Sequence, residues 1–200
     1  GGPVQTIALK NNALNPALDA GDDEAAAEAG AETDAAGFVR TDYVGVVNNE
    51  ANISDLGALE LQTEDNSLIV TTEIDVVDAY DQETSLREAV AFANSNADAS
   101  IITFDASLDG KTVTLAGTEL TLTSDITING DINGDNVADI TIDGNDASRV
   151  FQISSDGKAT LDALTISGGS ANFGGGINIA SGGKATLDAL TISGGSANFG

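Results

Sequence analysis

The sequence predicts an all-β fold, a parallel β-helix, with one α-helix near residues 85–95 capping its N-terminal end. Residues 157–174 recur unchanged as residues 183–200, so the two copies start 26 positions apart. A fixed period in this range is typical of chains that stack one supersecondary unit on the next. Short strands separated by Gly, Asp and Asn follow one another from Ser100 onward. Only 4% of the residues are aromatic, and a core of Ala, Val, Ile and Leu suits thin, regular layers.

The chain is strongly acidic, with 32 Asp and Glu residues against 7 Lys and Arg residues and a formal net charge of −25. The bases lie far apart along the sequence, so no phosphate-binding surface and no nucleic-acid partner are expected. Cysteine and histidine are absent, which excludes Ser-His-Asp and Cys-His catalysis from this sequence. No apolar run approaches the roughly 20 residues of a membrane-spanning helix, so no membrane span is expected.

Composition divides the chain into three parts. Residues 1–62 are rich in turn formers and contain a low-complexity Ala/Asp/Glu stretch over residues 22–36, which favours a loop. Residues 63–67 are polar and predict a linker. A stretch rich in β-branched residues then begins at Leu68, so we expect a second unit over residues 68–200.

The second unit opens with a strand and a helix. Residues 68–76 are rich in β-branched side chains and predict a strand. Ser85 and Glu88 have the spacing of a capping box, in which each side chain accepts the backbone N–H of the other residue. Apolar residues follow at helical spacing, so a helix of about ten residues is expected to end near Asn96.

Six short strands are predicted between Ser100 and the repeats. They are residues 101–104, 112–115, 120–122, 126–128, 140–142 and 150–153. Within the repeat, Ala185 and Leu187 share one parity, and Leu190 and Ile192 share the other. A strand that changes parity in this way turns a corner and still sends its apolar side chains inward. With residues 177–179 as a third wall, each period describes one coil with three walls and three corners.

Stacked coils place each residue about 4.8 Å from its copy in the next coil. We therefore expect three apolar ladders between the two copies: Leu161 on Leu187, Leu164 on Leu190 and Ile166 on Ile192. Glycines at 168–169, 174–176, 182–183 and 194–195 are expected at corners that need a positive φ. The spacing of Leu187, Leu190 and Ile192 also matches part of a leucine-rich repeat. Gly195 stands where that repeat has Asn or Cys, so the β-helix is favoured.

The opening of the second unit resembles a known module. Thr84-Ser-Leu-Arg-Glu-Ala89, the helix behind it and the strand Ile101–Asp105 resemble the CSLREA module. That module opens right-handed parallel β-helix domains in bacterial exported proteins of the polymorphic outer-membrane and autotransporter type. The resemblance covers residues 68–200 and implies a right-handed coil at an extracellular or bacterial outer-surface location. Thr84 stands where the family has Cys, and the Phe-x-x-Asn motif of the polymorphic membrane proteins in the strict sense is missing.

The N-terminal part resembles a different segment. Residues 1–6, 15–21, 33–40 and 55–60 are similar, in that order, to the closing segment of β-helix domains called choice-of-anchor Q. The resemblance implies that residues 1–62 end one β-helix module and that residues 68–200 begin the next. We therefore expect the chain to be a piece of a large tandem secreted or surface protein, with further coils after Gly200.

One constellation has the spacing of a calcium loop. Asp131, Asn133, Asp135 and Asp139 place oxygen side chains at relative positions 1, 3, 5 and 9, with the Val137 carbonyl at position 7. The pattern resembles calcium loops of several extracellular β proteins, so Ca²⁺ is the cofactor expected. Asn136 stands in the usual Gly place and tolerates a left-handed backbone. Position 12 holds Ile142 and not the Glu of an EF-hand, so a plain Asp/Asn turn is the alternative.

Two functions from different classes fit these observations. The favoured one is a non-catalytic structural or adhesive repeat region of a secreted or surface-exposed bacterial protein, which binds surfaces or glycans. The alternative is a polysaccharide lyase or hydrolase of the pectate-lyase-like β-helix kind, which needs clustered carboxylates or a basic Arg or Lys. Asp162, Asp188, Lys158 and Lys184 are repeat copies that favour ladders on a solvated face. Fold does not decide between the two functions, but the scarcity of bases and aromatic side chains favours the non-enzyme.

Overall fold

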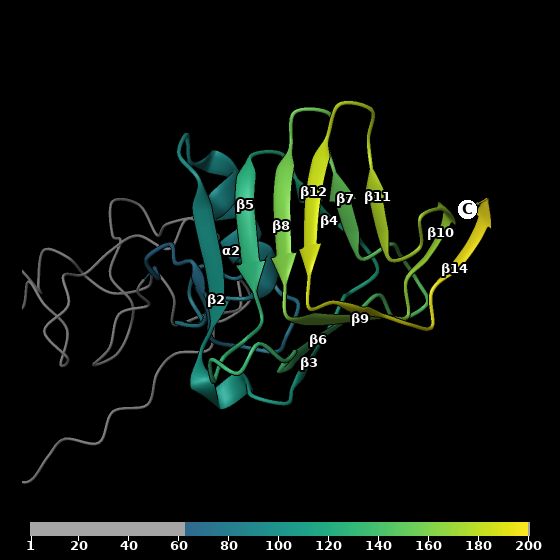
Figure 1. The fold of residues 1–200 in the computed structure, drawn as a ribbon. Coiled ribbons are helices and arrows are strands. Elements are labelled where there is room, and N and C mark those ends of the chain that lie inside the picture. Colours follow the sequence, from purple (N-terminus) through teal and green to yellow (C-terminus); the bar gives the residue numbers. More distant parts are fainter. Residues whose placement is uncertain (1–62, 200) are drawn as a thin grey trace, which may run out of the picture. The chain divides into compact units, whose positions relative to one another are not determined.

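The computed structural model describes residues 63–199, which Figure 1 draws as a coloured ribbon. Residues Asp65–Asp78 and Glu83–Gly200 group into one compact unit, and the fold below is that of this unit. Residues 63–67 form no helix or strand. The predicted closing segment over residues 1–62 lies outside the described residues.

The unit is a parallel β-helix, which confirms the predicted fold class. Its strands are β1 (Ile69–Val70), β2 (Ser100–Phe104), β3 (Thr112–Thr114), β4 (Leu120–Leu122), β5 (Asp125–Asn129), β6 (Ile140–Asp143), β7 (Phe151–Ile153), β8 (Lys158–Asp162), β9 (Leu164–Ser167), β10 (Ser170–Phe173), β11 (Ile177–Ile179), β12 (Lys184–Asp188), β13 (Thr191–Ile192) and β14 (Ser196–Phe199). Wall 1 is β1-β2-β5-β8-β12, wall 2 is β3-β6-β9-β13, wall 3 is β4-β7-β11, and β10-β14 form a short fourth ladder. All of these pairs are parallel. Figure 1 shows wall 1 stacking from teal β2 to yellow β12.

Successive coils stack residue on residue. Leu161 pairs with Leu187 in wall 1, and Ile166 pairs with Ile192 in wall 2. Leu164 begins β9, and Leu190 directly precedes β13. The register therefore follows the repeat, and within each wall side chains of one parity stay on the inside from coil to coil.

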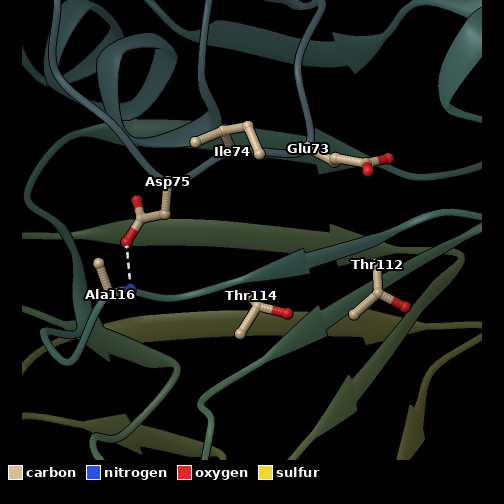
Figure 2. A pocket seen from close by; sticks show the side chains of 6 residues that line it. All are labelled: Glu73, Ile74, Asp75, Thr112, Thr114 and Ala116. Carbon is tan, nitrogen blue, oxygen red and sulfur yellow. Dashed lines mark hydrogen bonds between the residues drawn. The ribbon is translucent and has the colours of Figure 1, made fainter.

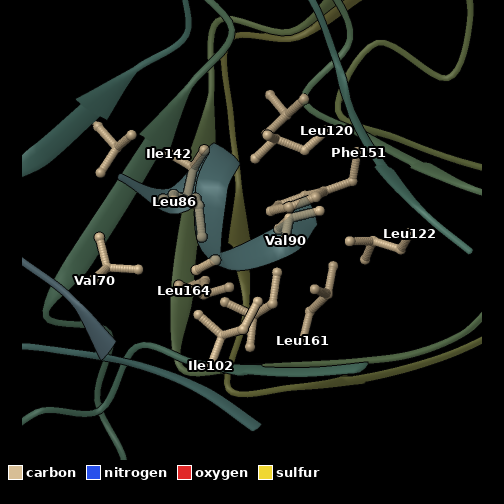
Figure 3. Close-up of a cluster of buried hydrophobic side chains, with 14 of the residues drawn as sticks. Val70, Leu86, Val90, Ile102, Leu120, Leu122, Ile142, Phe151, Leu161 and Leu164 are labelled. Atoms are coloured by element: carbon tan, nitrogen blue, oxygen red, sulfur yellow. The ribbon is translucent and has the colours of Figure 1, made fainter. Parts of the chain in front are cut away.

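The core runs through the inside of the coils as one cluster of buried apolar side chains. Figure 3 shows part of it, with Leu161 from wall 1, Ile142 from wall 2 and Phe151 from wall 3. All three are fully buried. Burying a side chain of this size contributes about 1.5–3 kcal/mol before the cost in conformational entropy is subtracted.

The helix α2 (Leu86–Ser95) has the predicted length and N-cap. Ser85 Oγ accepts the Glu88 N–H at 3.2 Å, and Glu88 Oε2 accepts the Ser85 N–H at 2.8 Å, so the capping box is present. Leu86 and Val90 extend from the helix into the core of Figure 3. Because α2 packs against β1, β2 and β4, it covers apolar side chains of the first coil.

The predicted strand over residues 68–76 is largely wrong. Only β1 belongs to wall 1, and further along the segment Ile74 makes an isolated parallel bridge with Thr114 at the edge of wall 2. Between these points the backbone N–H of Thr71 donates to the Thr84 carbonyl at 2.9 Å, and the Thr84 N–H donates to Thr71 Oγ1 at 2.8 Å. The segment therefore crosses from one wall to another, which a single straight strand cannot do.

The corners use glycine in two ways. Gly168, Gly174, Gly182 and Gly194 have the predicted positive φ. Their neighbours at 169, 175, 176, 183 and 195 do not, so the prediction is wrong for them. A Cβ at Gly169 would lie 2.1 Å from the Gly175 carbonyl oxygen, so there the close approach of two backbones requires glycine.

The corner between walls 1 and 2 is turned by alanine. Ala163 and Ala189 have φ of 49° and 47°, the left-handed conformation that alanine rarely adopts. Each lies between the two strands that meet at this corner. The parity change between Leu187 and Leu190 predicts a corner here, but nothing in the sequence predicts a positive φ at these alanines.

Candidate functional site

The predicted calcium loop, residues 131–139, replaces this alanine corner in the preceding coil. Ala163 alone separates β8 from β9, whereas residues 130–139 separate β5 from β6. The nine extra residues lengthen the coil, and the connection from β6 to β7 is two residues shorter than that from β9 to β11. As a result, 33 residues separate Asp125 from its wall neighbour Lys158, against 26 between copies in the repeat. Residues 133–137 are exposed, so the middle of the loop projects into solvent.

Asp131 organises the first half of the loop. Its Oδ1 accepts the N–H groups of Gly134 at 2.7 Å and Asp135 at 3.1 Å, and its Oδ2 accepts the N–H of Asn136 at 3.0 Å. Asn136 has a φ of 62°, the left-handed conformation expected at this position. A carboxylate that accepts several backbone N–H groups holds such a turn in one conformation.

Asp139 closes the loop from the other side. Its Oδ2 accepts the N–H groups of Ile132 at 2.8 Å and Asn133 at 3.2 Å, and its Oδ1 accepts the Asn133 side-chain amide at 3.2 Å. Asn133 Oδ1 accepts the N–H of Asp135 at 3.0 Å, and Asp135 Oδ1 accepts the N–H of Val137 at 2.9 Å. All five predicted ligand residues therefore belong to one hydrogen-bond network.

The carboxylate oxygens of this network bind N–H groups of the loop itself. Within residues 63–199, no group of three or more Asp, Glu, Cys or His side chains is placed to hold a metal ion. The geometry is that of a self-contained Asp/Asn turn, which was the alternative to a calcium loop. Calcium binding stays a prediction from the spacing of the residues.

A pocket of about 310 Å³ lies beside wall 2 and contains a buried carboxylate. It is lined by Glu73, Ile74, Asp75, Thr112, Thr114 and Ala116. Figure 2 shows Asp75 directing one carboxylate oxygen at the Ala116 backbone, and Oδ2 accepts the Ala116 N–H at 2.7 Å. Arg87 donates to both Asp75 oxygens at 2.7 and 2.8 Å and also to the carbonyl of Thr118 at 2.9 Å. Because protein donors bind both oxygens, the Asp75 carboxylate holds structural segments together and has a structural role.

Sequence reasoning missed this ion pair. Asp75 and Arg87 lie on different elements, and neither strand nor helix periodicity links them. The available signal is weak: Asp75 interrupts a β-branched apolar stretch.

Arg149 joins three coils. It forms a salt bridge with Glu119 and donates to Gln152 Oε1 at 2.8 Å. It also donates to the carbonyl oxygens of Phe173 at 2.8 Å and Gly174 at 2.9 Å. The Arg149 guanidinium therefore links neighbouring coils along one edge of the stack.

The charged residues of the repeat form ladders, as predicted. Lys158 pairs with Lys184 and Asp162 pairs with Asp188 in wall 1. Lys158 Nζ lies 2.8 Å from Asp125 Oδ2, and the Lys158 side chain is 60% exposed. Exposed pairs of this kind contribute little to stability, and the ladder is a solvated face.

One aromatic side chain stands out on the short ladder β10-β14. Phe173 is 58% exposed at the end of β10. At the preceding residue, Asn172 Oδ1 accepts the Asn198 side-chain amide at 2.8 Å across the ladder. One step back, Ser170 Oγ accepts the Ser196 hydroxyl at 3.3 Å. Because successive side chains of a strand point to opposite faces, the exposed ring lies on one face of the ladder and the row of amides and hydroxyls on the other.

The architecture places the chain in the class of parallel β-solenoids. Comparisons with protein-family models, with curated proteins and with solved structures find no match for it. Of the helices that the structure describes, none has the length and apolar character needed to cross a membrane.

Proposed function

We propose that this chain is a non-catalytic structural or adhesive repeat region of a large secreted or surface-exposed bacterial protein, as its CSLREA-like motif at residues 84–89 suggests. The observation that carries the proposal is the in-register stack of three parallel walls. Each coil contacts its neighbours directly, so such a stack extends as a stiff rod. A stiff rod with polar outer faces suits the display of a binding surface at a distance from a cell.

Glycans are the proposed ligands. The exposed face of Phe173 can stack on the apolar face of a sugar ring. The Asn172 and Asn198 amides lie on the opposite face of the same ladder and offer donors and acceptors there. The net charge of −25 favours neutral glycans over acidic ones, because like charges repel.

Binding of the purified chain to a glycan array and to insoluble neutral polysaccharides tests this proposal. Phe173→Ala should weaken binding by about threefold to tenfold, the equivalent of one aromatic contact. Ile101→Ala is the matched control, since Ile101 is 60% exposed on a different wall. An equal loss of glycan binding in the two variants would show that the glycan does not bind at the β10-β14 ladder. Binding to no glycan would overturn the adhesive part of the proposal.

The alternative function, a polysaccharide lyase or hydrolase, has less support. Arg87 and Arg149 are each held by a carboxylate and by backbone carbonyl groups, whereas a lyase needs a base that can take a proton from the sugar. Release of unsaturated or reducing sugars from pectin or alginate by this chain would overturn the non-catalytic proposal.

A further inference from the structure

We propose that Asn133 is a site of spontaneous deamidation, by which the exposed acidic loop gains a further carboxylate. The sequence holds two Asn-Gly pairs close together, Asn129-Gly130 and Asn133-Gly134. Glycine after asparagine favours this reaction, because no Cβ hinders the approach of its backbone nitrogen to the asparagine side chain. The structure places the two pairs in opposite environments.

Asn129-Gly130 is locked into the β-helix. The Gly130 N–H donates to the Asp162 carbonyl of the next coil at 2.9 Å, and the Gly130 carbonyl accepts the Asp139 N–H at 3.1 Å. Gly130 is buried, and a Cβ there would lie 2.4 Å from the Ala163 carbonyl oxygen. The Gly130 nitrogen is therefore released only when neighbouring coils separate, which costs a large part of the stability of the fold.

Asn133-Gly134 lies in the exposed part of the loop. Both residues are exposed, and a Cβ on Gly134 would meet nothing within 4 Å. The Gly134 N–H donates to Asp131 Oδ1 at 2.7 Å, so its release requires a local opening of the loop and no separation of coils. Asn133 Oδ1 accepts the Asp135 N–H at 3.0 Å, and a donor at this oxygen stabilises the negative charge that develops there during attack.

The reaction needs water and no other reactant. The Gly134 nitrogen bonds to Cγ of Asn133, the Cγ–Nδ2 bond breaks, and ammonia leaves with the proton that the Gly134 nitrogen gives up. Because both groups belong to one chain, the ring closure is intramolecular. Water then opens the cyclic imide at either carbonyl, which yields aspartate or isoaspartate.

The product changes the loop. Asn133 Nδ2 donates to Asp139 Oδ1 at 3.2 Å, and deamidation replaces this donor with a carboxylate oxygen. A hydrogen bond then becomes a contact between two negative charges, in a loop that already holds Asp131 and Asp135. The modified loop is looser than the original one, and the change cannot be reversed by refolding.

Peptide mapping by mass spectrometry during incubation of the folded chain, at physiological temperature and neutral pH in EDTA, tests the proposal. EDTA removes metal ions that would hold the loop closed. We expect Asn133 to convert at least about tenfold faster than Asn129, because the loop opens at a lower free energy than the coil. Asp131→Ala removes the acceptor of the Gly134 N–H and should speed conversion of Asn133 while leaving Asn129 unchanged.

The same chain in denaturant is the control, because both Asn-Gly pairs should then convert at similar rates. Circular dichroism checks that Asp131→Ala keeps the β-helix, and Asn133→Asp supplies the reference product. Equal rates at Asn129 and Asn133 in the folded chain would overturn the proposal. So would an unchanged Asn133 after a time in which the denatured chain has converted, or slower conversion in a folded Asp131→Ala variant.

Discussion

Arg87 of the capping helix binds Asp75 of the preceding segment through two hydrogen bonds, from Nε to Oδ1 at 2.8 Å and from Nη2 to Oδ2 at 2.7 Å. The Asp75 side chain is 1% exposed, and the Ala116 N–H binds the same carboxylate from the segment after β3. This pair therefore ties the helix, the segment before it and the first coil together. A buried two-pronged pair is costly to break, because the charge left behind has lost its partner.

Asp75→Ala should lower the free energy of unfolding by about 3 kcal/mol, as measured by urea denaturation. Lys111→Ala is the control, because the Lys111–Glu73 pair has side chains that are 51% and 42% exposed. Its loss should change the free energy of unfolding by less than about 1 kcal/mol. Similar small effects in both variants would show that the buried pair is not what holds the helix to the first coil.

The two copies of the repeat offer a matched test of packing. Leu161 is fully buried, whereas its copy Leu187 is 48% exposed. Leu161→Ala should cost about 2–5 kcal/mol of unfolding free energy. Leu187→Ala should cost less than half as much, because less apolar surface leaves water at that position. Thermal or urea unfolding of both variants decides this, and equal losses would contradict the difference in burial.

Asp105 should respond to its neighbour Ser107. The Ser107 hydroxyl and backbone N–H donate to Asp105 Oδ1 at 2.7 and 2.9 Å, and they hold the pKa of this carboxyl below its usual value. A lowered folded pKa stabilises the fold above the unfolded pKa, and this contribution disappears as the pH falls through the folded pKa. Ser107→Ala should therefore raise the pKa of Asp105, as followed by NMR of the carboxyl carbon. Ser95→Ala, a change on the helix, should leave that pKa unchanged.

Calcium binding by residues 131–139 requires the carboxylates to turn from the loop N–H groups to the ion. If they do, Ca²⁺ raises the midpoint of thermal unfolding, since a ligand of the folded state stabilises it. Asp135→Ala should abolish the rise, and Asp156→Ala, in a different exposed turn, should keep it. An unchanged midpoint with added Ca²⁺ would leave the loop as a plain Asp/Asn turn.

Elements with a strong local signal could be predicted closely. The helix has its predicted N-cap because the capping box depends on residues three positions apart. The short strands from Ser100 onward match because turn residues bracket each one. Residues 68–76 failed because β-branched residues indicate extended backbone without saying which wall the backbone joins.

The candidate loop could be predicted only in part. Its residues and the left-handed Asn136 follow from spacing and from local backbone preferences. The direction in which its oxygens point does not, because the same side chains can bind loop N–H groups or an ion. Phe173 was missed as a surface residue because nothing nearby in the sequence distinguishes an exposed ring from a buried one.

By itself the sequence determined the period of the coil, the inward parity of the walls and the cap of the helix. Each of these depends on exact repetition or on residues within one or two turns of one another. The tertiary structure decided that Arg87 binds Asp75, that Arg149 spans three coils, and that Gly130 is enclosed while Gly134 is open. These relationships join segments separated by corners of unequal length, and only the path of the backbone through those corners brings the segments together.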